Sequence, residues 1–313
     1  MKVFITGGSG FVGSTLTLKL INQGHRVTIL TRSIDRHRFL PEGASFLEGD
    51  PSREGPWQDR VADHDAVINL AGASIFARWT DGYKHTLRES RLLTTRHLVD
   101  AMAPRKGKET HLISTSAVGY YGFHEDEILE ETDPPGGDFL ATLAACWEAA
   151  ALEARQHGVR VVLCRFGIVL GSKGGALAQM LPLFRFRMGA PLGSGRQWFS
   201  WIHEWDLAHI FQFLLDHTDL EGPLNCTAPN PVRNREMTRI IGTVLGKPTF
   251  LPAVPAFLIR WMLGEFGSVI LKGQRVYPRR LLKHGFVFRF PTMQEALTDL
   301  LTENPPPGRK KGC

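Results

Sequence analysis

The sequence predicts an α/β protein in which a doubly wound parallel sheet is followed by a small α+β region. Short apolar, β-branched segments alternate with amphipathic stretches of helical spacing over the first half of the chain, and the first such segment runs into a glycine-rich turn. This alternation is typical of a parallel sheet with helices on both faces. The chain has 313 residues, which is enough for one large domain and an appendage.

The first strand, turn and helix are predicted at the amino end of the chain. Residues 2–6 are apolar and β-branched, so they are predicted to form a buried strand. They lead directly into the segment Gly7-Gly8-Ser9-Gly10-Phe11-Val12-Gly13. An amphipathic run over residues 11–23 follows and stops at Gly24, as expected of a helix.

The glycines of this turn have separate physical tasks. Gly7 permits the tight turn, Gly10 lets the backbone approach a pyrophosphate, and Gly13 lets the helix pack against the strand. Free N–H groups and the positive dipole end at the start of the helix favour phosphate. We therefore predict a dinucleotide site that includes Gly7, Gly10, Phe11, Val12 and Gly13.

The end of the second predicted strand indicates which dinucleotide binds. This strand covers residues 26–30, and Thr31 and Arg32 follow it, about twenty residues past the glycine turn. An acidic residue here would bind the ribose 2′-hydroxyl of NAD, whereas an arginine suits the 2′-phosphate of NADP. Arg32 can also stack on the adenine face; the alternative is a solvated surface arginine. The sequence favours NADP(H), with Thr31 and Arg32 as contacts.

Two further strands are predicted at residues 45–48 and 66–70, and the second one ends in Leu70-Ala71-Gly72. Ligands of an open parallel sheet bind beyond the carboxyl ends of its strands. Leu70, Ala71 and Gly72 are therefore expected to line the adenine–ribose side of the cofactor.

A long helix is predicted over residues 83–102 from its apolar spacing. Arg91 is predicted to reach a phosphate from this helix, and the alternative is a solvent-facing charge. The strand predicted at residues 111–114 then leads to Ser116 and the pair Tyr120-Tyr121, which lie where reacting groups of such a sheet belong.

The remaining elements are predicted with less regular spacing. Asp138 is expected to cap a helix that runs to about Gln156 and ends at Gly158. Further along the chain we predict a strand at 159–165, a helix at 180–188, a strand at 199–203, a helix begun by Asp206 and an edge strand at 224–227. The predicted domains are residues 1–228, residues 229–303 and a disordered basic tail at 304–313.

Composition excludes several classes of protein. No apolar stretch is long enough to span a membrane, and the chain begins directly with a core strand rather than a signal peptide. The four cysteines have no metal or redox spacing, which favours free thiols in a reducing cytoplasm. The net charge of +6 comes without a basic stripe of interleaved aromatics, so nucleic-acid binding is not expected. We expect a small-molecule substrate and no membrane, and a homodimer is left open.

Several motifs together resemble the extended short-chain dehydrogenase/reductases, the NAD(P)-dependent sugar-nucleotide epimerases and dehydratases. They are the glycine turn, Asn69-Leu70-Ala71-Gly72, Ser116 ahead of Tyr120-Tyr121-Gly122, Arg165-Phe166-Gly167 and Trp201-Ile202-His203-Glu204-Trp205-Asp206. A second set resembles an atypical branch with bacterial "epimerase family" proteins and mammalian short-chain dehydrogenase family 39U. It comprises Trp79, Ser90-Arg91, residues 117–122, Trp147-Glu148, Gly174-Gly175, Trp201-Ile202-His203 and Gly273-Gln274-Arg275. The resemblance covers nearly the whole chain and implies a Rossmann fold, NADP(H) binding and a small C-terminal domain.

One departure from the family pattern concerns the chemistry. Typical members carry a tyrosine and a lysine four residues apart at the start of the helix after Asp138, and the lysine lowers the pKa of the tyrosine. Here Phe139 or Leu140 stands at the tyrosine position and Leu143 or Ala144 at the lysine position. None of these side chains can move a proton.

The candidate substitutes are Ser116, Tyr120 and His203. Ser116 matches the family's active-site hydroxyl, Tyr120 or Tyr121 offers a phenolic proton, and His203 titrates near neutrality. Each has a structural alternative: packing for the tyrosines, and a hydrogen-bond role beside a helix start for His203. Val169, after the strand that ends at Arg165, is expected to touch the nicotinamide side.

Two functions follow as the main hypotheses. The first is an NADP(H)-dependent oxidoreductase, or an epimerase-like relative, that acts on an unidentified small substrate. The second is an NADP(H)-binding sensor or regulatory protein with little catalysis, which the missing Tyr–Lys pair favours. NAD-dependent sugar-nucleotide epimerisation is a weaker third hypothesis, because Arg32 disfavours NAD and the chemistry needs the absent tyrosine.

Overall fold

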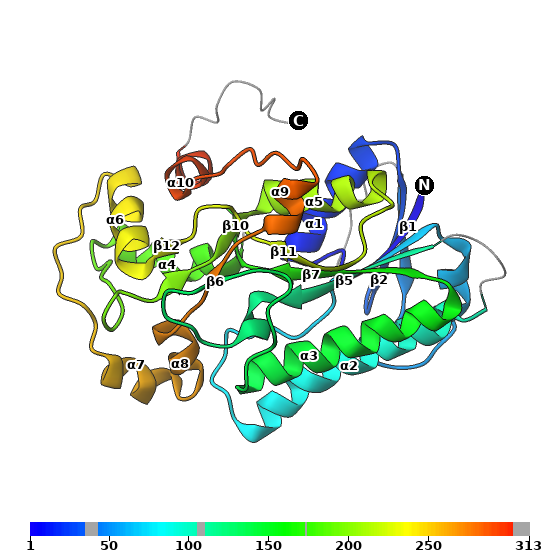
Figure 1. Cartoon of the computed structure of the whole chain (residues 1–313), viewed down its shortest axis with the longest axis horizontal. Helices are drawn as coiled ribbons and strands as arrows, with labels where there is room; N and C mark the ends of the chain where they lie inside the picture. The colour runs from blue at the N-terminus through cyan, green and yellow to red at the C-terminus, as the bar shows by residue number, and fades with distance from the viewer. Residues whose placement is uncertain (35–42, 105–109, 173, 303–313) are drawn as a thin grey trace.

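A computed structural model describes residues 1–34, 43–104, 110–172 and 174–302. Its centre is a parallel sheet with the strand order β11-β7-β5-β4-β1-β2-β3 (Figure 1). The strands are β1 (Lys2–Thr6), β2 (Arg26–Thr31), β3 (Ala44–Glu48), β4 (Ala66–Asn69), β5 (His111–Ala117), β7 (Arg160–Phe166) and β11 (Gly222–Cys226). The order reverses between β1 and β4, which makes this the switch point where such sheets bind ligands. The predicted doubly wound α/β fold is confirmed.

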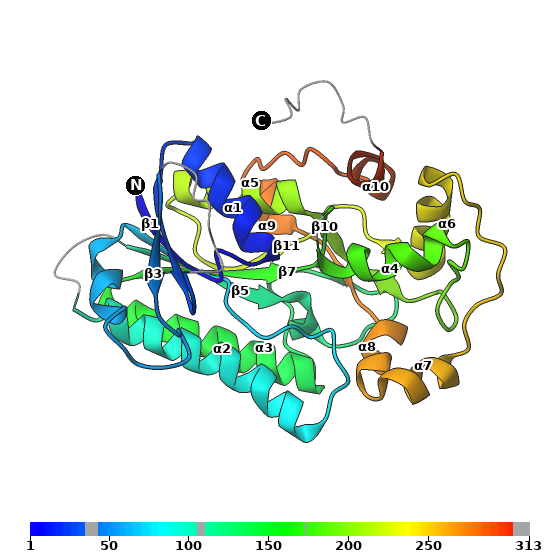
Figure 2. The ribbon, with the colours of Figure 1, turned by 180° about the vertical axis from the view of Figure 1, so that it is seen from behind.

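Helices cover both faces of the sheet. The four that do so are α1 (Phe11–Asn22), α2 (Asp81–Met102), α3 (Phe139–Leu152) and α5 (Glu204–Asp216). Helices α2 and α3 lie side by side on one face, and α1 and α5 lie on the other (Figures 1 and 2). Strand side chains alternate between the two layers: Val3 and Ile5 join the core against α1 and α5, while Phe4 joins the core against α2.

The described residues also form shorter elements between and after these strands and helices. They are η1 (Gln58–Asp63), η2 (Val118–Tyr121), η3 (Glu153–His157), β6 (Ile128–Leu129), β8 (Ile168–Leu170), α4 (Gly175–Arg185), β9 (Trp198–Phe199), β10 (Trp201–His203), β12 (Val232–Arg233), α6 (Asn234–Val244), α7 (Ala256–Leu263), α8 (Phe266–Leu271), β13 (Arg275–Val276), α9 (Arg279–Lys283) and α10 (Met293–Leu301). Among the described residues, no helix combines the length and the apolar character needed to cross a bilayer.

The C-terminal region packs back onto the sheet domain. Strand β13 pairs in parallel with β6, which lies between β5 and α3 in the chain. Lys84 of α2 forms an ion pair with Glu265, just before α8. The small region of helices and strands predicted after residue 228 is therefore present, and it packs against the domain that contains the sheet. The predicted tail at 304–313 lies outside the described residues.

The starts of helices α4 and α5 differ from the sequence prediction. Helix α4 begins at Gly175 rather than at residue 180, because Ala176 and Leu177 are already buried in its first turn. Helix α5 begins at Glu204 and is capped by His203, not by Asp206. The carboxylate of Asp206 instead accepts hydrogen bonds from the N–H groups of Arg289 and Phe290, at 2.9 and 3.0 Å.

The strand predicted at residues 199–203 is in fact two strands. Strand β9 pairs with β12, whereas β10 pairs with β8, and Ser200 separates them. The Ser200 hydroxyl donates to the carbonyl oxygen of Gln274 at 2.8 Å, which turns the chain between its two partners.

Candidate functional site

The glycine turn between β1 and α1 leaves no room for side chains. Gly7 adopts a φ of +71°, a backbone conformation that favours glycine. The Gly10 N–H donates to the Gly7 carbonyl at 3.0 Å, which closes the turn. A Cβ built on Gly13 would lie 2.1 Å from the Gly7 oxygen, so the helix can approach the strand only because Gly13 has none.

The start of α1 is open to a ligand. Gly10 is the N-cap residue, and no side chain of the described residues caps this helix end. Gly10 is exposed, and Phe11 and Val12 are only partly buried. Uncapped N–H groups at a helix N-terminus bind anions. This bare backbone cradle therefore fits a pyrophosphate, and the predicted residues Gly7, Gly10, Phe11, Val12 and Gly13 lie together in it.

The structure also brings the turn against the residues that follow β4. A Cβ on Gly7 would lie 2.9 Å from the carbonyl carbon of Leu70 and 3.0 Å from the Ala71 nitrogen. The Thr6 hydroxyl, which donates to Asn69 at 2.8 Å, lies 3.4 Å from the Ala71 N–H and accepts from it. The predicted adenine–ribose residues thus adjoin the predicted phosphate cradle.

Arg91 lies beside this group but is engaged by the protein itself. A Cβ on Gly72 would lie 3.4 Å from the Arg91 guanidinium carbon. The guanidinium donates to the carbonyl oxygens of Leu87 and Ala73, both at 3.1 Å, and packs on the Trp147 ring. Burial lowers the pKa of Arg91 to about 10. Its place fits the predicted phosphate contact, but part of its donor capacity is already used.

The end of β2 keeps Arg32 accessible. Thr31 is buried, and its hydroxyl and the Ser33 N–H form a local turn. Arg32 is exposed and lies close enough to Asp50 to affect its ionisation. Although burial acts in the opposite direction, hydrogen bonds from Ser52 and the charges of Arg32 and Arg53 lower the pKa of Asp50. An exposed guanidinium beyond this strand end is in the position predicted for a 2′-phosphate contact.

The segment after β8 folds over the first turn of α1. Val169 lies in β8, paired with Ile202 of β10. Cβ atoms on Gly171, Gly174 and Gly175 would lie 2.6 to 2.7 Å from the Phe11 ring, so the ring rests directly on this glycine segment. The predicted contact Val169 and the predicted contact Phe11 are thereby brought to one end of the sheet.

A closed ionic network occupies the ends of β5 and β7. The buried Ser116 hydroxyl donates to a Glu148 carboxylate oxygen at 2.6 Å. Arg165 of β7 binds both Glu148 oxygens, at 2.8 and 2.9 Å, and the two side chains are nearly inaccessible to solvent. Although burial acts in the opposite direction, the hydrogen bonds that Arg165 donates to Glu148, together with its other contacts, raise the pKa of Arg165. Ser116 is therefore bound to a carboxylate rather than free to donate to a substrate.

The two tyrosines have different surroundings. Arg165 donates to the Tyr121 hydroxyl at 2.9 Å, and that hydroxyl donates to the Asn225 side-chain oxygen at 2.7 Å. Burial raises the pKa of Tyr121, so it is a packed member of the network. The Tyr120 ring lies under the Arg165 guanidinium at 3.5 Å and is only partly buried. Within the described residues its hydroxyl makes no hydrogen bond, which leaves Tyr120 as the freer phenol.

The start of α3 indicates whether Phe139 or Leu140 stands where typical family members carry the tyrosine. Asp138 caps this helix, as predicted, and accepts from the N–H groups of Leu140 and Ala141. A Cβ on Gly119 would contact Leu140 at 3.4 Å, whereas the Phe139 ring packs on Trp79. Leu140 therefore faces the turn after β5, in the place of the tyrosine.

A small cavity of about 40 Å³ lies beside these residues. Its lining is mostly apolar and comes from the starts of α2 and α3 and from α8: Trp79, Phe123, Asp138, Phe139, Leu140, Glu265, Ser268 and Val269. This volume is well below the roughly 300–1,000 Å³ of a typical ligand site, so the cavity has room for no more than a small apolar group.

His203 has the structural role that was the alternative to catalysis. Its Nδ1 accepts from the Trp205 N–H at 3.0 Å, its Nε2 lies 3.3 Å from an Asp299 oxygen, and its ring stacks on Phe290. The side chain is 1% exposed. These contacts lead to α10 and its preceding segment, not to Ser116 or Tyr120, and they give no support to a catalytic role for His203.

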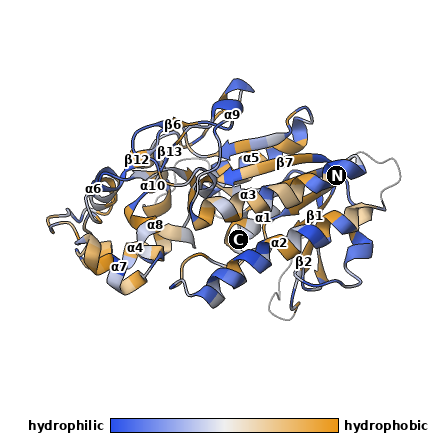
Figure 3. Ribbon diagram, turned by 60° about the horizontal axis from the view of Figure 1, so that its bottom comes forward, coloured by the Kyte–Doolittle hydropathy of each residue, from blue (hydrophilic) through white to orange (hydrophobic). Residues whose placement is uncertain are grey.

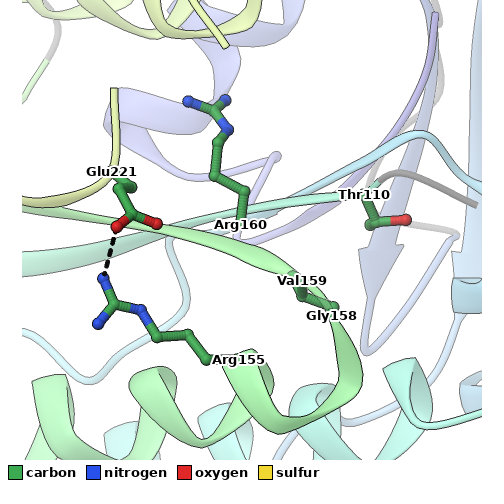
Figure 4. Close-up of a pocket in the computed structure, with 6 residues that line it drawn as sticks. All are labelled: Thr110, Arg155, Gly158, Val159, Arg160 and Glu221. Atoms are coloured by element: carbon green, nitrogen blue, oxygen red, sulfur yellow. Dashed lines mark ion pairs between the residues drawn. The ribbon is translucent and has the colours of Figure 1, made fainter. Parts of the chain in front are cut away.

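A separate groove lies at the opposite edge of the sheet. It has a volume of about 480 Å³ and is lined by residues that precede or begin β5, β7 and β11: Thr110, Arg155, Gly158, Val159, Arg160 and Glu221 (Figure 4). Arg155 and Glu221 form an ion pair across it at 3.6 Å. Ligands of these sheets bind at the carboxyl ends of the strands, so this groove is not the cofactor site.

Sequence reasoning missed the ionic network. In the sequence, Glu148 and Arg165 stand out only as members of the motifs Trp147-Glu148 and Arg165-Phe166-Gly167. A detectable signal exists: Glu148 is the single charged residue of α3, and Arg165 follows four apolar residues of β7. Buried charges pair because an unpaired one is very costly. Pairing them would have placed α3 against β7 at these residues.

Comparisons with known proteins agree with this geometry. Residues 3–226 match the family model "NAD dependent epimerase/dehydratase family", and residues 254–300 match "Domain of unknown function (DUF1731)". The chain is 41% identical over 303 residues to "Epimerase family protein SDR39U1 homolog, chloroplastic" of Arabidopsis thaliana, covering 96% of this chain and 87% of that protein. It is 37% identical over 312 residues to "Epimerase family protein YfhF" of Bacillus subtilis, covering 97% and 99% of the two chains.

A solved structure gives the same result for the fold. The human epimerase family protein SDR39U1 (isoform 2), crystallised with NADPH, superposes with a TM-score of 0.83 at 33% identity, covering 96% of this chain and 99% of that one. Family match, fold and glycine cradle together show that this chain belongs to the NAD-dependent epimerase/dehydratase family, in the branch of the SDR39U1-like epimerase family proteins.

Proposed function

We propose that this protein is an NADP(H)-dependent oxidoreductase that acts on a small apolar carbonyl compound. The observation that carries the proposal is the pairing of an open backbone cradle at α1 with an apolar cavity at the start of α3. The bound nicotinamide supplies or accepts a hydride. The chain's own residues bind the phosphates and hold the network around Ser116 in place.

NADP(H) rather than NAD(H) is supported by the charge beyond β2. Arg32 is exposed at the position that meets the 2′-substituent in such folds. An arginine offers a planar set of donors that suits a phosphate. The human relative was crystallised with NADPH, which supports the same preference.

The side chains that can donate a proton limit which substrates this site could reduce. Ser116 donates to Glu148, and the side chains at the tyrosine and lysine positions are Leu140 and Ala144. Tyr120 is the proton donor that the geometry leaves for this region. A quinone suits such a site, because hydride addition gives a delocalised anion that takes its proton from solvent. An ordinary ketone gives an alkoxide and needs a general acid.

The second candidate is an NADP(H)-binding sensor with little catalysis. The observation that favours it is the closed network, in which the Ser116 hydroxyl and the Tyr121 phenol are both satisfied within the protein. The test is the rate of NADPH oxidation with a panel of quinones, aldehydes and ketones, measured with protein of known NADPH stoichiometry. We expect turnover with quinones above that with ketones. Stoichiometric binding without oxidation across the panel would refute the oxidoreductase and leave the sensor.

Arg32→Asp tests the cofactor preference. Loss of a charge-assisted contact to the 2′-phosphate is expected to weaken NADPH by about tenfold to a hundredfold, with a much smaller change for NADH. Arg26→Asp is the matched control, since Arg26 is an exposed arginine at the other end of the same strand. Calorimetric titration of both coenzymes measures the effect. Equal losses for NADPH and NADH in Arg32→Asp would remove the proposed contact.

A further inference from the structure

A surface of exposed large apolar side chains surrounds α7, away from the cofactor cradle. Phe257 and Trp261 of α7 are 73% and 77% exposed, and the adjoining Phe250 and Phe186 are 73% and 77% exposed. Leu183, Met188, Leu251, Leu258 and Met262 complete this set of exposed apolar side chains. Exposed apolar patches of this size mark interaction sites. We call the segments 183–188 and 247–262 the α7 surface.

The two segments of the α7 surface lie next to each other. Lys247 donates to the carbonyl oxygen of Arg185, which ties the end of α4 to the chain after α6. The Val254 N–H donates to the Pro191 carbonyl oxygen at 2.8 Å, and the Gly193 N–H donates to the Val254 carbonyl oxygen at 2.9 Å. These bonds hold the chain before α7 beside the chain after α4. Helix α7 lies at the outer edge of the molecule in two views, and its residues include strongly hydrophobic ones (Figures 2 and 3).

The charges on this surface are all of one sign. Segments 183–188 and 247–262 contain Arg185, Arg187, Lys247 and Arg260 and no aspartate or glutamate. Nearby Glu265 forms an ion pair with Lys84. Aromatic, leucine and methionine side chains among arginines and lysines are the composition of helices that lie in the interface of an anionic bilayer.

A second copy of the chain fits this surface poorly. A two-fold dimer would place the same patch on both subunits, so four basic side chains would face four others without an acidic partner. A negatively charged lipid surface instead complements the arginines and accepts the aromatic rings. We propose that the α7 surface docks this protein peripherally on membranes rich in anionic lipid, with α7 parallel to the bilayer plane. This departs from the sequence-based expectation that the chain contacts no membrane.

Vesicle flotation with the full chain tests the proposal. Vesicles of an equal mixture of phosphatidylcholine and phosphatidylglycerol are expected to carry the protein, and vesicles of phosphatidylcholine alone are expected to carry much less. Phe257→Ser with Trp261→Ser removes two exposed rings and should lower binding at least about tenfold. Arg185→Glu with Arg260→Glu should lower it about fivefold or more for each charge, and added salt should do the same.

Matched controls separate docking from misfolding. Val287 is 78% exposed outside the α7 surface, so Val287→Ser should leave flotation unchanged, as should Arg96→Glu on α2. NADPH binding by every variant reports that the fold is intact. Absence of flotation with the mixed vesicles, or equal flotation of the wild-type chain and the two double variants, would overturn the proposal. A dimer that the Phe257/Trp261 variant abolishes, together with no vesicle binding, would overturn it in favour of a second copy.

Discussion

The glycine turn at β1–α1 and the network at β5–α3–β7 lie at the same edge of the sheet but are built by opposite means. In the turn, missing side chains leave backbone N–H groups open, and a Cβ on Gly13 would meet Gly7 at 2.1 Å. In the network, the polar groups of Ser116, Glu148 and Arg165 are buried and bound to one another. The glycine turn therefore has N–H groups that can still bind a ligand, whereas the polar groups of the network already bind one another.

This difference indicates how the two halves of a site in the epimerase/dehydratase family can diverge. Binding of a dinucleotide depends on backbone geometry, which tolerates little change. Proton transfer depends on a few side chains, and here the region around Leu140 is packed instead as an apolar contact. The backbone that can bind a cofactor is thereby kept, while the side chains that transfer a proton in typical members are absent from the start of α3.

Filling the glycine turn has the largest expected effect. Gly13→Ala forces the turn or the helix to shift, so we expect the unfolding free energy to fall by about 3 kcal/mol or more and NADPH binding to be lost. Urea unfolding and calorimetric titration measure both. Gly137→Ala is the control, because a Cβ there meets no described atom within 4 Å, and it should change stability by less than about 0.5 kcal/mol. Similar losses in the two variants would show that the turn is not specially constrained.

Breaking the network has the next largest effect, and it acts on stability. Glu148→Gln leaves the buried Arg165 guanidinium without its charged partner, which should cost about 3 kcal/mol. Replacing both side chains, as Glu148→Leu with Arg165→Met, should recover most of this loss. Urea midpoints at constant m-value are the measurement. If the double variant were as unstable as the single one, the ion pair would contribute net stability that apolar packing cannot replace.

Leu140→Tyr sharpens the contrast by returning a proton donor to the second region. A phenol at this position stays protonated near pH 7 and faces the turn after β5, so aldehyde reduction with NADPH should rise at least about tenfold. Quinone reduction should change less. Phe139→Tyr is the matched control, because this side chain packs on Trp79. An equal response to both substitutions, or none to Leu140→Tyr, would mean that proton supply does not limit the rate.

The smallest expected effect is a pH dependence of stability that arises beside β1 and β2, the strands next to the glycine turn. His64 is buried against Phe4, its Nδ1 donates to the Arg60 carbonyl at 2.8 Å, and its Nε2 pairs with the Thr28 hydroxyl at 2.9 Å. Burial lowers the pKa of His64, so the unfolded chain binds more protons near pH 6. Its contribution to stability is complete above the unfolded value of about 6.5 and is lost as the pH falls through that value.

Unfolding free energies measured between about pH 7.5 and 5.5 should fall as the pH falls, because the unfolded chain takes up the additional proton. His64→Gln should flatten the pH dependence, while substitution of the exposed His85 should not. An unchanged slope in His64→Gln would assign the dependence to other groups, such as His25 and His209, whose pKa values burial also lowers.

The backbone half of the site was predictable because its information is local. Strand β1 was predicted at its observed bounds, and β2 was predicted one residue short of Thr31. The glycine spacing has meaning only between adjacent elements, so a single sequence reveals it. The N-cap role of Asp138 is local in the same way.

The side-chain half depends on contacts between distant segments. Tyr121 and Asn225 are 104 residues apart in the chain, and their hydrogen bond exists only once β5 and β11 flank β7. The start of α5 was misassigned for the same reason: Asp206 has the composition of a cap, but its carboxylate binds residues 289 and 290. Nothing near Asp206 in the sequence identifies those partners.

The pairing of β6 with β13 has a consequence for biosynthesis. Glu131, just after β6, accepts hydrogen bonds from the N–H groups of Asn225 and Arg280, and β13 precedes Arg280 by only a few residues. A ribosome that has released the entire central sheet still holds this last strand in its exit tunnel. The nascent chain can therefore complete this pairing only after all seven strands of the central sheet have been made.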